Sequence, residues 1–108
     1  MHAVFITFRS AVGLEELAAG NREYAEALRD GAAPGLIAKT WLSDGATLGG
    51  FCLFADPTAA DRYLEGMFAE AITRNPTFSD VRVERYDVDE ALSTINNGLG
   101  AMALSGRG

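Results

Sequence analysis

A lysine and the only tryptophan of this 108-residue chain lie two residues apart in the stretch PGLIAKTWL, residues 34–42. The stretch opens with a turn dipeptide and then reads as a strand, in which alternate residues point to the same face. Lys39 and Trp41 therefore share one face. A cation beside an aromatic wall is the outline of a small-molecule pocket.

The hairpin that follows determines what lies opposite this pair. Asp44-Gly45 is a strong signal for a two-residue turn leading into a second strand at 47–55. A turn of this length fixes the register of the two strands. The predicted pairs on the lysine face are Trp41 with Leu48, Lys39 with Gly50, and Ile37 with Cys52.

Gly50 has no side chain, so the space opposite Lys39 is predicted to be a hollow. The residues expected to border it are Lys39, Trp41, Cys52 and Phe54. An alternative is that Gly49-Gly50 marks a β-bulge or a close backbone approach. In that case Trp41 packs over the glycines as core and Lys39 extends its amine to solvent.

Two further polar residues fall on the apolar stripes of predicted helices. Asn21 lies one turn after Leu17 on the first helix, where its amide could bind a ligand or a buried backbone group. Tyr63 lies on the stripe of the second helix, and its hydroxyl needs a partner if it is enclosed. That partner is either the ligand or the backbone.

Charge and composition exclude several functions. A net charge of −6 disfavours nucleic acid and anionic membranes as partners, because both require a basic surface. The chain has no long apolar run and no signal-peptide pattern. Its single cysteine, Cys52, has no partner for an internal disulfide. These features predict a cytoplasmic protein.

Metal and nucleotide chemistry find little support in the sequence. His2 is the only histidine, and no cluster of His, Cys and carboxylates is spaced as metal ligands are. The segment GLGAMA, residues 98–103, matches a dinucleotide-binding pattern but lacks the strand, helix and later acidic residue that this site requires. We expect no metal and no cofactor.

The elements that must position these residues follow a βαββαβ order, typical of the ferredoxin-like α+β fold. Strands are predicted at 3–9, 34–42, 47–55 and 79–88, and helices at 14–30 and 57–75. Right-handed crossovers place both helices on one face of a four-stranded antiparallel sheet. We expect one domain over residues 1–97 and a flexible tail over 98–108.

The first three predicted strands carry large apolar residues on both faces. An antiparallel sheet with one solvated face does not need this. A second copy of the same sheet would cover the free face, which predicts a homodimer.

The stretches PGLIAKTWL, GGFCLFAD, YLEGMF and YDVDEALSTIN together resemble the YdhR-type mono-oxygenase family of the dimeric α/β-barrel superfamily. The resemblance runs in the same order from the first strand to about residue 97. It implies a homodimer whose two sheets face each other as a barrel. For activity it implies oxygenation of an electron-rich aromatic polyketide or quinol-like molecule by dioxygen, without cofactor. Cys52 departs from the family pattern, where an aromatic or aliphatic residue is usual.

The resemblance gives the candidate residues their roles. Lys39 and Trp41 would be catalytic: the ammonium of Lys39 would stabilise a substrate oxyanion, and Trp41 would stack on the substrate ring. The expected substrate-binding residues are Asn21, Gly50, Cys52, Phe54 and Tyr63. Two alternatives stay open, namely a cyclase or isomerase acting on a related polyketide, and a binding or structural homodimer without catalysis.

Overall fold

A four-stranded antiparallel sheet forms the centre of the computed structural model, which describes residues 1–99. The elements are β1 (His2–Ser10), α1 (Leu14–Arg29), β2 (Leu36–Asp44), β3 (Thr47–Phe54), α2 (Pro57–Tyr63), η1 (Leu64–Phe68), α3 (Ala69–Arg74), β4 (Phe78–Asp87) and α4 (Glu90–Ile95). The strand order is β2-β3-β1-β4, and all three pairings are antiparallel. The predicted ferredoxin-like fold is confirmed.

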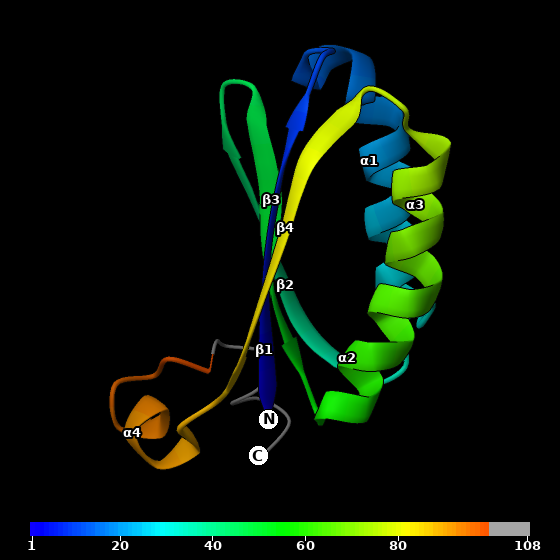
Figure 1. Cartoon of the computed structure of the whole chain (residues 1–108). Coiled ribbons are helices and arrows are strands. Elements are labelled where there is room, and N and C mark those ends of the chain that lie inside the picture. Colours follow the sequence, from blue (N-terminus) through cyan, green and yellow to red (C-terminus); the bar gives the residue numbers. More distant parts are fainter. Residues whose placement is uncertain (100–108) are drawn as a thin grey trace.

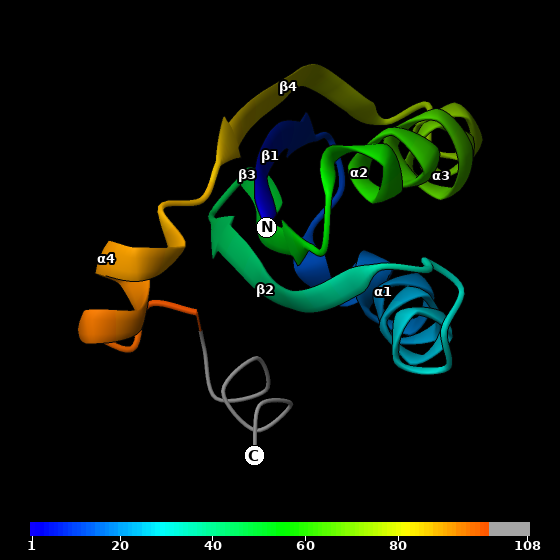
Figure 2. The same cartoon turned by 90° about the horizontal axis from the view of Figure 1, so that it is seen from below.

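The helices α1, α2 and α3 cover one face of the sheet (Figure 1). Seen from below, α1 stands over the β2 side and α2–α3 over the β4 side, while α4 lies across the sheet from them (Figure 2). Most of the predicted tail, residues 100–108, lies outside the described residues. Leu99 is buried and packs with Leu53.

The helices that cover the sheet form two arms: α1 is the first, and the continuous run α2–η1–α3 is the second. Local signals in the sequence determine where the second arm begins. The Asp56 side chain accepts a hydrogen bond from the Ala59 N–H at 2.8 Å, and Pro57 occupies the first turn, where its missing N–H is not needed. The single helix predicted over 57–75 is in fact three segments. Its middle, η1, is a π-helical turn, a feature found often at functional sites.

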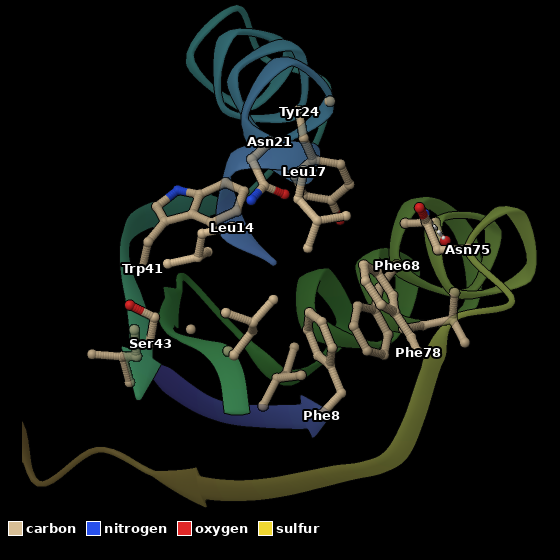
Figure 3. A pocket seen from close by; sticks show the side chains of 18 of the residues that line it. Phe8, Leu14, Leu17, Asn21, Tyr24, Trp41, Ser43, Phe68, Asn75 and Phe78 are labelled. Carbon is tan, nitrogen blue, oxygen red and sulfur yellow. Dashed lines mark hydrogen bonds between the residues drawn. The ribbon is translucent and has the colours of Figure 1, made fainter. Parts of the chain in front are cut away.

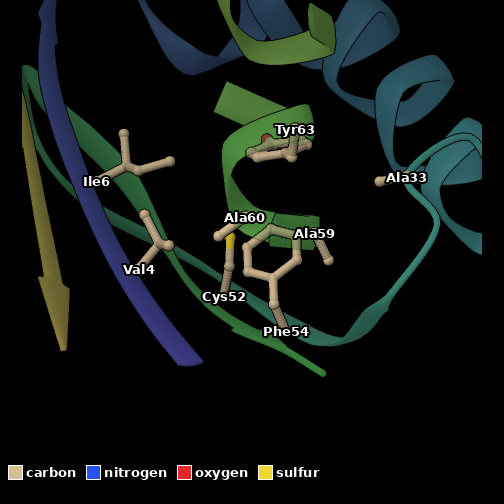
Figure 4. Packing of buried hydrophobic residues seen from close by; sticks show 8 residues of the cluster. All are labelled: Val4, Ile6, Ala33, Cys52, Phe54, Ala59, Ala60 and Tyr63. Carbon is tan, nitrogen blue, oxygen red and sulfur yellow. The ribbon is translucent and has the colours of Figure 1, made fainter. Parts of the chain in front are cut away.

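The core lies between the sheet and α2 (Figure 4). Its most enclosed side chains are Val4 of β1 and Cys52 and Phe54 of β3, none of which has any exposed surface. Ala59, Ala60 and Tyr63 of α2 pack on them. Small alanines let the helix approach closely, so α2 closes this end of the sheet against solvent.

The opposite face of the sheet carries apolar side chains that nothing in residues 1–99 covers. One row runs across all four strands: Thr40, Phe51, Phe5 and Glu84 face one another in adjacent positions. Phe51 is 43% exposed. A phenylalanine in the centre of a sheet is usually buried, so this face fits the expectation that something covers it.

The hairpin register differs from the prediction. The turn lies one residue later in the chain, so most β2 residues face a β3 residue two positions further along. Asp44 pairs with Thr47, so the two turn residues are Gly45 and Ala46, and Gly45 takes the positive φ of 59° that glycine tolerates. Trp41 is therefore opposite Gly50, and Lys39 is opposite Cys52. The predicted pairs Trp41 with Leu48 and Lys39 with Gly50 are wrong. A slip of two residues keeps every side chain on its face, so Lys39 and Trp41 still share theirs.

A second irregularity lies at the start of β2. The register shifts between Leu36 and Ala38, so the predicted pairing of Ile37 with Cys52 is also wrong. Ile37 packs instead with Leu53 and Ala38, whereas Leu36 packs against the core under α2. A bulge of this kind bends a strand, and here β2 curves toward α1 (Figure 2).

Candidate functional site

A cavity of about 450 Å³ lies on the helix face of the sheet, between the two helical arms (Figure 3). Its volume is within the range of small-molecule sites. Each arm and several strands contribute to its walls. Representative lining residues are Leu17, Tyr24, Trp41, Phe8, Phe68 and Phe78. The walls are therefore mainly apolar and aromatic.

Lys39 is the cation of this cavity. Its Nζ lies 3.9 Å from the centre of the Trp41 ring and 4.9 Å from the centre of the Tyr24 ring. The two rings meet edge to face, with their centres 6.0 Å apart. Within residues 1–99 no carboxylate forms an ion pair with Lys39. The ammonium is thus held by aromatic faces alone, an arrangement that is favourable by cation–π attraction.

Burial shifts the acid–base properties of this amine. Removal from water disfavours the charged form and lowers the pKa of Lys39. The same burial raises the pKa of Cys52. The thiol therefore stays protonated near neutral pH and does not serve as a counter-ion for the ammonium.

Gly50 makes room for the lysine side chain. A Cβ added at Gly50 would lie 2.8 Å from Lys39 Cε, closer than real contacts allow, and 3.7 Å from Nζ. The space over Gly50 is therefore occupied by the end of the lysine chain. At Gly49 the backbone approaches β1 so closely that a Cβ would lie 2.0 Å from the Ile6 carbonyl oxygen. The alternative of a close backbone approach is therefore correct for Gly49. Its second part, a lysine amine extended to solvent, is not, because Lys39 lines the cavity.

Two tyrosines from different helical arms meet in the wall. The hydroxyls of Tyr24 on α1 and Tyr63 on α2 are hydrogen-bonded at 2.6 Å. Burial raises the pKa of Tyr24 to about 12 and also raises that of Tyr63, where the Tyr24 hydroxyl adds to the effect. Both phenols are neutral near pH 7 and act as hydrogen-bond donors and acceptors.

Five of the seven predicted site residues line the cavity: Lys39, Trp41, Asn21, Gly50 and Tyr63. Asn21 points into it from α1 (Figure 3), and its amide makes no hydrogen bond to other residues of the 1–99 range. This amide is free to bind a ligand. The partner of the Tyr63 hydroxyl is the Tyr24 hydroxyl, whereas the sequence predicted either a ligand or the backbone.

Cys52 and Phe54 do not line the cavity. The prediction that they border the hollow is wrong, because both side chains are fully enclosed beneath α2. Phe54 packs on the Tyr63 ring with centres 5.5 Å apart, behind the cavity wall. The shifted register puts Cys52 opposite Lys39, but the end of the lysine chain lies over Gly50 and the Trp41 ring.

Tyr24 and an aromatic end of the cavity were missed. Phe8 and Phe78 stack with ring centres 4.5 Å apart, and Phe68 lies 6.1 Å from Tyr63. In the sequence, Tyr24 and Phe68 belong to apolar helical stripes, which indicate core. The spacing of Tyr24 three residues after Asn21 was the one available signal, since residues three apart share a helix face.

The sole histidine lies outside this site. His2 is in β1, where its Nδ1 is 3.1 Å from Asp87 Oδ1 and its Nε2 accepts from Arg85 Nε at 3.0 Å. Among residues 1–99, no group of three or more His, Cys, Asp and Glu side chains is placed to hold a metal ion. None of the helices in this part of the chain is long and apolar enough to span a membrane.

A ferredoxin-like sheet with an aromatic cavity under its helices defines the chain as an α+β protein. It belongs to the family described as "Putative mono-oxygenase ydhR", whose model matches residues 4–99. This confirms the resemblance drawn from the sequence. No curated protein is significantly similar to the chain.

Two solved structures illustrate the likeness. NE2512 from Nitrosomonas europaea, a protein of unknown function, is 27% identical, with 82% of this chain and 88% of that chain covered and a TM-score of 0.62. SnoaB, a cofactor-independent oxygenase from Streptomyces nogalater, is 16% identical, with 81% and 92% covered and a TM-score of 0.62. At 16% identity the second likeness concerns the fold alone.

Proposed function

We propose that this protein is a cofactor-independent mono-oxygenase of an aromatic polyketide or quinol-like molecule. The observation that carries the proposal is the Lys39 ammonium, enclosed by the Trp41 and Tyr24 rings in a cavity of about 450 Å³. Membership of a mono-oxygenase family supports the reaction class. SnoaB, which shares the fold, is itself described as a cofactor-independent oxygenase.

In this proposal the substrate provides the electrons and the protein provides the environment. An anthrone-like substrate loses a proton to give an oxyanion whose charge is shared with a ring carbon. Lys39 stabilises that oxygen, and the preorganised ammonium favours the ionised substrate. The carbon then reacts with dioxygen: the methylene loses two hydrogens and gains one oxygen atom, and the second oxygen leaves as water.

The remaining cavity residues hold the substrate. Trp41 offers a ring face to the charged end, and the phenylalanines Phe8, Phe68 and Phe78 offer apolar surface further in. The free amide of Asn21 supplies a hydrogen bond to a second oxygen substituent. Two oxygen-bearing positions on a flat ring system are what hydroxylated anthrones and naphthoquinols present.

The test is a thermal-shift screen with anthrone and naphthoquinols, followed by oxygen uptake. A ligand at 100 times its Kd stabilises the fold by about 2.7 kcal/mol, which moves Tm by several degrees in a domain of this size. Gly50→Leu forces the lysine aside and should abolish the shift, whereas Gly66→Leu, on an open helix surface, should keep it.

The outcomes separate the candidate functions. Binding with oxygen uptake supports the mono-oxygenase. Turnover of the ligand without oxygen uptake would favour a cyclase or isomerase. The absence of any thermal shift would contradict the proposed substrate class and favour a binding or structural protein.

We further propose that a second copy of the chain covers the free sheet face. Phe5 and Phe51 form the apolar centre of this face, with Thr40 and Glu84 at its sides. Two such faces related by a two-fold axis bring apolar centres together, as in obligate dimers. The expected assembly is a homodimer with its two cavities on the outer faces of the paired sheets.

A further inference from the structure

Lys39 is the only lysine in the chain, although nine residues are basic. All other basic residues are arginines. Several of these pair with acidic side chains at the surface, as Arg22 does with Glu26, Arg29 with Asp30 and Arg85 with Asp61. An arginine keeps its proton throughout the pH range of proteins, whereas a lysine can lose it and become a nucleophile. The single lysine is placed inside the cavity.

The surroundings of Lys39 favour a reactive amine. Among residues 1–99 no carboxylate pairs with it, and its end lies over Gly50 in contact with open cavity volume. The titratable groups around it are Tyr24 from α1, Tyr63 from α2, Cys52 from β3 and Glu16 at the cavity wall. Tyr24 and Cys52 are neutral near pH 7, because burial raises the pKa of each. Burial lowers the pKa of Lys39 itself.

The aromatic rings act in the opposite direction. Trp41 and Tyr24 stabilise the ammonium through their faces, which keeps the amine oriented in the cavity while it is charged. After loss of a proton the same rings form a stacking wall for an aromatic reactant. Because Nζ lies over the indole face, 3.9 Å from its centre, a reactant ring in the cavity beside the lysine and Trp41 would bring its carbonyl carbon next to Nζ.

We propose that Lys39 forms an imine with small aromatic aldehydes or ketones that enter the cavity. The neutral Nζ attacks the carbonyl carbon, a C–N bond forms, and the carbonyl oxygen takes up a proton to give a carbinolamine. Loss of a proton from nitrogen and departure of the hydroxyl as water then give the imine. Nothing is oxidised or reduced, so the step needs no co-reactant. It uses the same cavity as the proposed oxygenase but does not depend on oxygen chemistry.

The experiment traps the imine with 2-naphthaldehyde and sodium cyanoborohydride. The adduct is located by intact mass and by peptide mapping. The variant Arg62→Lys supplies an internal standard, because residue 62 is exposed on α2 and lies outside the cavity lining. Both lysines then compete for the aldehyde in the same folded molecule, and the amine of Met1 gives a third site, which is paired with Glu90.

We expect Lys39 to be labelled at least about tenfold faster than the lysine at position 62 at pH 7, because a buried amine loses its proton at lower pH than an exposed one. The Lys39 rate should also level off at lower pH than the rate at position 62. Equal or slower labelling of Lys39 would overturn the proposal. So would a preference that persists after the protein is unfolded in urea.

A second readout keeps this result separate from the proposed oxygenase. Lys39→Arg retains the charge and removes the nucleophile, and it should give no adduct at residue 39. If trapping fails while anthrone still stabilises the wild-type protein, Lys39 is an ammonium ligand and the imine proposal alone is wrong. If trapping succeeds without any anthrone shift, the imine stands and the oxygenase proposal fails.

Discussion

Replacing Lys39 by methionine should make the protein more stable and less active. Loss of the cation–π contacts of Lys39 with Trp41 and Tyr24 should cost about 0.5–2 kcal/mol of stability. Methionine has a similar length, and contacts between its sulfur and these rings should recover about 0.3–1.5 kcal/mol. What the variant no longer carries is the unfavourable burial of an ammonium. Its free energy of unfolding at pH 7 should therefore equal or exceed that of wild type.

The pH dependence gives the sign of this effect. The pKa of Lys39 is lower in the folded state than in the unfolded state, because burial disfavours the ammonium. Between the two pKa values the unfolded chain binds more protons, so wild-type stability rises with pH there. Below the folded pKa the burial penalty is fully present. The advantage of Lys39→Met should thus shrink as the pH rises from 7 toward 10, measured by urea denaturation of both proteins.

Activity should change in the opposite direction. A hydrogen bond to a charged group contributes about 1.5–3 kcal/mol, and losing it from the transition state lowers kcat/KM by about ten- to a hundredfold. The assay is oxygen uptake with whichever anthrone or quinol passes the thermal-shift screen. The account of the buried charge would be refuted if Lys39→Met had a clearly lower free energy of unfolding than wild type at pH 7 and if this difference did not change with pH. Unchanged kcat/KM would remove Lys39 from the mechanism.

Three other changes test the fold and the assembly. Tyr63→Phe should cost about 1 kcal/mol in urea denaturation, because it removes the 2.6 Å hydrogen bond to Tyr24, and an unchanged midpoint would contradict that bond. Asp56→Ala should also cost about 1 kcal/mol through loss of the α2 cap, whereas Asp56→Asn should restore most of it. Phe51→Arg should give a monomer by light scattering, while Val83→Arg, on the opposite face beside Ile6, should leave a dimer; a dimer in both would disprove the proposed interface.

The sequence was most informative where a pattern depends on parity or on local chemistry. Lys39 and Trp41 lie two residues apart on one strand, so they share a face in any register, and the error in the turn does not separate them. Asp56 and Pro57 marked a helix start through contacts within one turn. The turn itself was misassigned because Asp44-Gly45 and Gly45-Ala46 both place glycine where a positive φ is needed.

The walls of the cavity could not be predicted in the same way. Tyr24 and Phe68 lie on apolar stripes, and periodicity cannot distinguish a stripe that fills a core from one that faces an empty volume. Cys52 and Phe54 were assigned to the site because they share a face with Lys39. The core ends along that face where α2 stops packing closely on the sheet. Ala59 and Ala60 allow this close packing, but the position of α2 over Cys52 and Phe54 is known only from the three-dimensional structure.

The alternation of side chains on two neighbouring strands, β2 and β3, connects the proposed site with the proposed dimer. On β2, Lys39 and Trp41 point into the cavity, while Thr40 between them lies in the row of the free face. On β3, Gly50 underlies the lysine and its neighbour Phe51 projects to the other side. A partner sheet that packs on Phe51 would therefore hold rigid the same backbone that supports the lysine. Because the lysine chain lies so close to Gly50 that a Cβ added there would be 2.8 Å from Lys39 Cε, small movements of this backbone change the space available to the amine. The monomeric Phe51→Arg variant should consequently bind anthrone more weakly, although residue 51 never touches the ligand.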